Sequence, residues 1–347
     1  METTARRAAT TTLVAGSIVV LALALWKIRV VVALVFLGFI VAAAMRPSVD
    51  WLVARRIPRP VGVLLHYALL LGAIAIALWL LVPRAIDQVQ AATSGNGIHH
   101  EAVHSTGIKH ELLTSLDKRL RRLPSGSKLI HPAVEVTKTA FEALIGIFFV
   151  FAVGAYWIFE RDRTIRLVQS LVPVRHRRVT RETWLVIDQK LGGFVRGELL
   201  LILFVGVVLS TGFFLIGLPY WLLIGAFAGV VEIVPVIGPL AAGALAIGVG
   251  ATQSWHLALF AGLIVLAVRQ LEDYVIVPRV LGHAVGLSPL VVLVSVTSIG
   301  ILFGGFYVLL AIPIAAVVAT LVDVVLRDID PADLEPPPVI FTGAREE

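Results

Sequence analysis

The chain has 347 residues, of which 58% are hydrophobic and only 15% are charged, and its mean hydropathy is +0.94. Soluble domains carry about a quarter charged residues, so the composition indicates a polytopic membrane protein. The net charge of +6 does not predict nucleic-acid binding, because the basic residues lie in loops beside apolar segments, as the positive-inside rule requires. The chain has no cysteine, which excludes disulfides, thiolate metal sites and cysteine catalysis.

Apolar segments follow one another along the whole chain. They cover residues 13–26, 30–45, 61–82, 141–159, 199–217, 219–251, 256–277 and 289–325. A helix needs about 20 residues to cross the hydrocarbon core. The sixth and eighth segments are too long for one straight helix and contain Pro235, Pro239 and Pro313, so they are expected to be broken helices or re-entrant hairpins. We therefore predict an all-α polytopic membrane protein with about eight transmembrane helices, broken or re-entrant in the C-terminal half.

Lysine and arginine set the expected orientation. Loop 46–60 holds four arginines and segment 160–198 holds nine basic residues, so both are expected on the cytoplasmic side of a bacterial inner membrane. Both termini are then cytoplasmic as well. Lys27 and Arg29, between the first two apolar segments, favour a retained helical hairpin over a cleaved secretory signal.

This orientation divides the chain into five regions. They are N-terminal transmembrane helices (1–82), an extracytoplasmic amphipathic helical segment (83–140), a transmembrane helix with a basic cytoplasmic linker (141–198), a C-terminal transport core (199–325) and a disordered cytoplasmic tail (326–347). In the second region, leucines at helical spacing predict a helix for a partner subunit, the protein's own spans or the membrane surface. Five of the nine histidines lie there too; they lack paired ligand spacing and are interpreted as solvated loop residues rather than a metal or pH-sensing site.

Charged residues are scarce from Leu199 to Val322. In these 124 residues the five formal charges are Glu232, Arg269, Glu272, Asp273 and Arg279. A charged side chain at the bilayer centre costs roughly 2.5–3.5 kcal/mol, so such residues either lie near an interface or serve a function. On a helix, Arg269 can pair with Glu272 at i,i+3 and with Asp273 at i,i+4, which leaves a structural ion pair and a coupling role equally open.

Glu232 has no basic residue within one helical turn. It must be protonated, paired across helices or exposed to a water-filled cavity, unless it is an interfacial residue at the end of a short span. The segments Ile233–Gly238 and Ile276–Gly282 both begin Ile-Val-Pro and have a glycine three or four residues after the proline, and each follows an acidic residue. Matching helix breaks of this kind point to a transporter site between repeats.

The hypothetical site therefore has two sets of residues. Glu232, Glu272, Asp273, Arg269 and Arg279 would bind protons or cations, whereas Pro235, Gly238, Pro239, Pro278, Gly282 and Pro289 would open the helices around a cavity. Close helix packing is expected at the GxxxG patterns Gly225–Gly229 and Gly300–Gly304. Trp51, Trp157 and Trp255 are expected at span ends, in an aromatic belt.

Several motifs together resemble the autoinducer-2 exporter (AI-2E) family of bacterial membrane proteins. They are R-P-S-V-D-W-L (46–52), I-P-R-P (57–60), G-G-F-V-R-G-E-L-L (192–200), G-L-P-Y-W-L-L-I-G (217–225), E-I-V-P-V-I-G-P (232–239), Q-L-E-D-Y-V-I-V-P-R-V-L-G (270–282), V-G-L-S-P-L (285–290) and G-G-F-Y-V-L-L-A-I-P (304–313). The resemblance covers about residues 13–325, except the external segment. It implies seven or eight helices, cytoplasmic termini, permease-like export and homo-oligomers. Family members are linked to autoinducer-2 export, and some to sodium or lithium exchange for protons. One departure is Glu198, where the family pattern leads us to expect glutamine.

The leading functional hypothesis is a secondary exporter for a small polar solute or signalling molecule, coupled to a proton or monovalent cation. A Na⁺(Li⁺)/H⁺ antiporter is the first alternative, and a non-transporting membrane scaffold or envelope-assembly partner that uses residues 83–140 is the second. No P-loop, zinc-protease or serine-hydrolase motif occurs, so neither an ATPase nor another enzyme is predicted, and no cofactor or metal is expected.

Overall fold

The computed structural model describes residues 2–93, 130–234, 237–277 and 286–334. All regular structure in these ranges is helical, which confirms the predicted all-α class. Several predicted features lie outside the described residues: Pro235, Pro278, Arg279 and Gly282, residues 94–129 of the external segment, and residues 335–347 of the tail.

The helices follow the apolar segments but extend well beyond several of them. They are α1 (Glu2–Lys27), α2 (Arg29–Ala54), α3 (Arg59–Thr93), α6 (Ile130–Leu171), α7 (Arg177–Leu215), α8 (Trp221–Val231), α9 (Ile237–Gln253), α10 (Trp255–Leu271), α12 (Pro289–Phe303), α13 (Gly305–Val308) and α14 (Ala311–Val325). Short turns of other helix types are η2 (Val174–His176), η3 (Glu272–Ile276) and η4 (Pro331–Asp333). Within the described ranges, four stretches are long and apolar enough to cross a membrane: Arg29–Ala54, Arg59–Arg84, Phe141–Leu171 and Val174–Leu215. The protein is thus a polytopic membrane protein, while the number of crossings stays a prediction.

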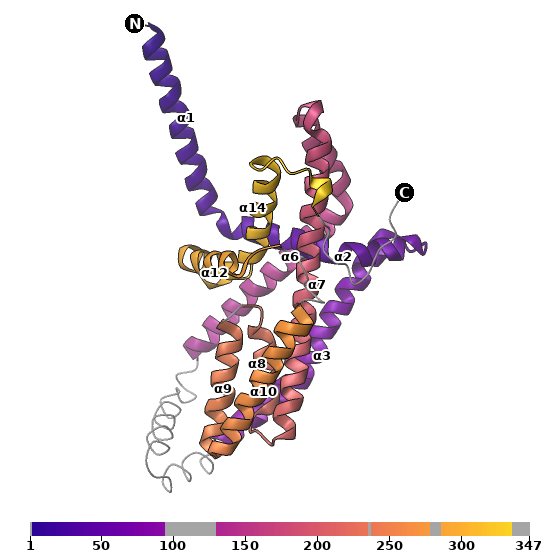
Figure 1. Cartoon of the computed structure of the whole chain (residues 1–347), viewed down its shortest axis with the longest axis vertical. Helices are drawn as coiled ribbons and strands as arrows, with labels where there is room; N and C mark the ends of the chain where they lie inside the picture. Colours follow the sequence, from indigo (N-terminus) through magenta and orange to yellow (C-terminus); the bar gives the residue numbers. More distant parts are fainter. Residues whose placement is uncertain (1, 94–129, 235–236, 278–285, 335–347) are drawn as a thin grey trace.

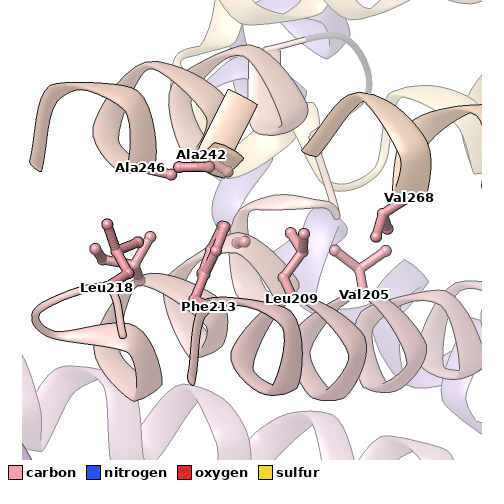
Figure 2. Packing of buried hydrophobic residues seen from close by; sticks show 10 residues of the cluster. Val205, Leu209, Phe213, Leu218, Ala242, Ala246 and Val268 are labelled. Atoms are coloured by element: carbon pink, nitrogen blue, oxygen red, sulfur yellow. The ribbon is translucent and has the colours of Figure 1, made fainter. Parts of the chain in front are cut away.

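The C-terminal half of α7 packs with α8, α9 and α10 into a four-helix bundle, which we call the α7–α10 bundle (Figure 1). Figure 2 shows Leu209 and Phe213 of α7 pointing toward Ala242 and Ala246 of α9. The glycines of the Gly225–Gly229 pattern lie directly against α7, because a Cβ at Gly225 would collide with Ser210 and one at Gly229 would lie 2.7 Å from the Ile202 carbonyl oxygen. The predicted close packing at this pattern is confirmed.

A second region contains α2, α6, the N-terminal half of α7, and α14, with a core that includes Ile40, Leu191 and Leu310. Pro47 lies inside α2, where this helix contacts α7. Because proline has no N–H, it leaves the carbonyl four residues earlier, at Ala43, without its intrahelical donor. Arg196 of α7 compensates by donating from Nη1 to the carbonyl oxygens of Ala43, at 3.5 Å, and Ala44, at 3.1 Å. Gly192 permits this approach, since a Cβ there would collide with the Ala43 carbonyl.

Both long apolar segments of the C-terminal half are broken, as predicted. Segment 219–251 divides into α8 and α9, and segment 289–325 divides into α12, α13 and α14. The second break does not arise at Pro313, which lies in the first turn of α14, where its missing N–H has no intrahelical acceptor to lose. It arises at Gly304, whose φ of +99° is a left-handed conformation that favours glycine.

Two smaller predictions were wrong. A Cβ at Gly304 would meet no atom within 4 Å, so this glycine ends a helix instead of forming a packing surface with Gly300. Trp157 is buried, with its ring 4.3 Å from that of Phe39 and 5.6 Å from that of Trp184, and it is not part of an exposed aromatic belt. Trp51 and Trp255 are exposed, as a belt requires.

Candidate coupling site in the α7–α10 bundle

The first part of the site is the break between α8 and α9. Helix α8 ends at Glu232, whose amide still donates to the Ala228 carbonyl at 3.1 Å. The chain then turns so sharply that the start of α9 touches the end of α8: a Cβ at Gly238 would collide with the Val231 carbonyl. Glycine at 238 is therefore required for the hairpin. Pro239 lies in the first turn of α9, where proline is tolerated, so it helps to start this helix.

The second part is the end of α10. Its last turn carries Arg269, and residues Glu272–Ile276 continue as a π-helical turn, η3. Single π turns are rare, and many occur at functional sites because the wider turn redirects side chains. A cation in the last turn of a helix is favourable, whereas a carboxylate at a helix C-terminus faces the negative end of the helix dipole. Glu232 occupies such a C-terminal position, and Glu272 is buried at the start of the π-helical turn, so each needs a positive partner.

Arg269 connects the two breaks. Its Nη1 lies 3.3 Å from Glu232 Oε1 and 3.0 Å from Glu272 Oε1, and its Nη2 lies 2.9 Å from Asp273 Oδ1. The side chains of Glu232 and Glu272 are each only 6% exposed, whereas Asp273 is 44% exposed. We call these four residues the acidic cluster. Both local pairs expected from helical spacing are formed, and of the alternatives for Glu232 the structure shows pairing across helices.

Glu198 of α7 adds a fourth carboxylate, which was not among the predicted site residues. Its carboxyl group is half-buried and interacts electrostatically with those of Glu232 and Glu272. The signal was available in the sequence, as a carboxylate where glutamine was expected. Within the described residues, three carboxylates thus pair with the guanidinium of Arg269, and the carboxylate of Glu198 interacts with two of them. This imbalance favours a proton or another cation at the cluster.

Not every predicted site residue joins this cluster. Pro289 is the first residue of α12, following Ser288, whose hydroxyl accepts a hydrogen bond from the Val291 amide. Proline is favoured at that position, so Pro289 starts a helix, and α12 packs against α13 and α14. In the described residues, no group of three or more histidine or acidic side chains is arranged to hold a metal ion.

Sequence reasoning also missed a second charged group, in the region around α2, α6 and α7. Asp188 Oδ2 lies 2.9 Å from Arg46 Nη1 and 3.0 Å from Arg161 Nη2, and Arg46 also pairs with Asp50 at 3.3 Å. We call these four residues the Arg–Asp network. They border a cavity of about 30 Å³, which is enough for a water molecule. Arg161 is buried, and its Nε has no hydrogen-bond partner in the described protein, so a water there would satisfy it.

Helix α7 carries a further buried cation, Lys190. Its ammonium donates to the Thr320 hydroxyl of α14 at 3.0 Å, and that hydroxyl donates in turn to the Ala316 carbonyl at 2.9 Å. The basic segment 160–198, which was interpreted as a cytoplasmic linker, consists mostly of the end of α6 and the start of α7. Three of its charged side chains, Arg161, Asp188 and Lys190, connect neighbouring helices.

Comparison with known proteins gives a family match over most of the chain. The model of the family described as "AI-2E family transporter" matches residues 16–327. "Putative transport protein YrrI" of Bacillus subtilis (strain 168) is 24% identical over 304 residues, covering 84% of this chain and 85% of the relative. "Putative transport protein YueF" of the same organism is 26% identical over 289 residues, covering 77% of each chain.

A shorter match reaches the same class of protein in another bacterium. "Putative permease PerM" of Escherichia coli (strain K12) is 25% identical over 212 residues, covering 56% of this chain and 58% of the relative. The family match spans nearly the whole chain, including both regions and the acidic cluster. The chain therefore belongs to the AI-2E family of membrane transporters.

Proposed function

We propose that the protein is a secondary transporter of the bacterial cytoplasmic membrane, with cytoplasmic termini, that exports a small polar solute or signalling molecule. We further propose that the acidic cluster couples this export to protons or monovalent cations. The family and the relatives named as transport proteins and permeases support transport in general. The observation that carries the coupling is the guanidinium of Arg269, which holds together buried carboxylates from two separate helix breaks.

The cluster has the properties of a site where cations compete. In the described state Arg269 neutralises Glu232 and Glu272 from the same nitrogen, and its contact to Glu232 is the longer one. Removing one partner from a buried ion pair costs about 3–5 kcal/mol. Arg269 therefore leaves Glu232 readily only when a proton or a monovalent cation takes its place.

Such an exchange would also move the helices. The Arg269–Glu232 contact joins α10 to the α8–α9 hairpin, so its loss frees the hairpin to repack. Alternating access in transporters with broken helices arises from repacking of this kind around a fixed site. The free energy that drives this repacking is the difference between the free energies of cation binding to the two arrangements of the hairpin.

Sodium–proton antiport is the more specific form of this proposal. The excess of carboxylates over guanidinium groups in the cluster suits a small cation as the exchanged species. Solute export and cation exchange require the same carboxylates and differ only in the species whose transport is coupled to the proton. Measuring the flux of the solute and of the cation therefore distinguishes the two forms.

The test uses the full chain in proteoliposomes with an imposed pH gradient. Proton movement is followed with a pH-sensitive dye after addition of sodium or lithium, and transport of a hydroxylated furanone signal is measured in parallel. Glu232→Gln keeps the shape of the side chain, and Arg269 retains Glu272 and Asp273, so the variant should insert normally and lose coupled flux. Glu142→Gln, an exposed glutamate of α6, is the matched control and should keep it. Full flux in Glu232→Gln with either substrate would refute the coupling role.

A further inference from the structure

A cavity of about 680 Å³ lies among α2, α6, α7 and α14, in the region of the Arg–Asp network. Its volume falls within the range of roughly 300–1,000 Å³ that small-molecule sites occupy. It is separate from the acidic cluster: Asp188, which lines it, lies ten residues before Glu198 on α7, or about 15 Å along the helix axis. Nothing in the proposed coupling mechanism uses this space.

Aromatic rings form one wall of the cavity. Phe36 and Phe39 come from α2, Trp157 from α6 and Trp184 from α7. Trp157 lies between two of them, with its ring 4.3 Å from Phe39 and 5.6 Å from Trp184. Aliphatic side chains of α14 complete the lining. Such a wall binds an apolar body, and the faces of its tryptophan rings attract positive charge.

The polar part of the lining is acidic at Asp188 and Asp328, and it also includes the imidazole of His176 and the hydroxyls of Thr180 and Thr183. No lysine or arginine is among the residues that line the cavity. Asp188 is held by Arg46 and Arg161. Asp328 is exposed at the mouth, and in the described part of the chain its side chain has no hydrogen bond or ion pair. It is therefore available to a ligand.

The segment after α14 fixes Asp328 at this mouth. The chain turns at Asp328, with φ of +56°, and the segment 326–334 then returns to the start of α7. Arg178 of α7 donates to Asp330 at 2.5 Å, and Pro331 is fully buried beneath. The backbone at Asp328 is thus held at the mouth of the cavity.

We propose that this cavity binds a hydrophobic organic cation, such as an aryl-substituted quaternary ammonium or phosphonium ion. The aromatic wall fits its apolar body, and the unpaired carboxylate of Asp328 and the ring faces fit its charge. A membrane phospholipid fits less well, because its phosphate would meet carboxylates and neither lysine nor arginine in the lining. Binding at this site needs no ion gradient, so it stands independently of the proposed coupling.

The test measures binding to the full chain in phosphatidylcholine nanodiscs by equilibrium dialysis, with empty nanodiscs as background. Tetraphenylphosphonium is the probe, and tetraphenylborate is an anion of nearly the same size and shape. We expect one saturable site per chain for the cation and none for the anion. Asp328→Asn should weaken cation binding about fivefold, the effect of losing an exposed ion pair, and Trp184→Leu about tenfold.

Asp333→Asn is the matched control, since Asp333 is exposed on the same segment but does not line the cavity; it should leave the dissociation constant unchanged. Saturable binding of both ions with equal affinity would make the cavity an uncharged apolar site and overturn the proposal. So would the absence of saturable binding, or saturable cation binding that neither Asp328→Asn nor Trp184→Leu weakens. Because Asp328 is exposed and unpaired, its variant tests the proposal even if Trp184→Leu fails to fold.

Discussion

The acidic cluster and the Arg–Asp network differ in how many guanidinium groups pair with each buried carboxylate. In the acidic cluster one guanidinium serves three carboxylates, and two of these carboxylates are almost completely buried. In the Arg–Asp network two guanidinium groups share the buried carboxylate of Asp188. The first group is short of positive charge and spans two helix breaks, whereas the second is balanced in charge, gives Asp188 two guanidinium partners and joins long unbroken helices. One is suited to exchange its cation, the other to hold helices in place.

The largest expected effect comes from removing the guanidinium that the acidic cluster cannot replace. Arg269→Met leaves Glu232 and Glu272 buried without a positive partner, and we expect a loss of about 3–5 kcal/mol in the free energy of unfolding at neutral pH. The measurement is the midpoint of unfolding in mixed detergent and SDS micelles, followed by tryptophan fluorescence.

Arg161→Met is the corresponding change in the Arg–Asp network, and it should cost about 2 kcal/mol, because Asp188 keeps its contact with Arg46. Arg163→Met, a side chain that is 79% exposed, serves as the control and should have little effect. Equal losses for Arg269→Met and Arg161→Met would show that the two groups do not differ in redundancy.

The next effect tests whether the second region is held rigidly. Gly192→Ala places a methyl group against the Ala43 carbonyl and pushes α7 away from α2, and we expect it to destabilise the protein by about 1–2 kcal/mol. Gly72→Ala in α3 is the control, because its Cβ meets nothing within 4 Å and alanine favours a helix. The same unfolding midpoint should rise slightly in the control. An unchanged unfolding midpoint for Gly192→Ala would mean that α2 and α7 can move apart at this contact without loss of stability.

The smallest effect concerns the exposed pair between Arg178 and Asp330. The hydrogen bond from Arg178 lowers the pKa of Asp330 below its ordinary value. A lowered pKa means that the contact contributes fully above the unfolded pKa, about 3.9, and is lost as the pH falls through the lower folded value. The protection factors of residues 326–334 against hydrogen exchange, corrected for the pH dependence of the intrinsic rate, should therefore fall only at strongly acidic pH. Asp330→Asn should show faster exchange than the wild type at neutral pH, and identical exchange rates would contradict the assignment.

Much of the acidic cluster follows from the sequence alone. Scarcity of charge identified Glu232, Arg269, Glu272 and Asp273, and helical spacing predicted the two local pairs of Arg269. The contact with Glu232 did not follow, because it joins residues 37 positions apart and depends on how the α8–α9 hairpin packs against α10. Nor did the π-helical turn, which the sequence does not mark.

The Arg–Asp network was missed because segment 160–198 was interpreted as a linker from its basic residues. The helical pattern was nevertheless present: Thr183, Val186, Lys190, Gly197 and Leu201 are buried at intervals that match one face of α7. The residues paired with Asp188 come from α2 and α6, and no local spacing reveals such partners.

Helix α7 runs unbroken from Arg177 to Leu215 and carries residues of both charged groups. The backbone hydrogen bonds of this continuous helix join its two halves, so a displacement of one half can also displace the other. An occupant near Asp188 and a proton near Glu198 would then both act on the position of α7. By thermodynamic linkage, if the occupant changes the free energy of proton binding, the proton changes the free energy of binding of the occupant by the same amount.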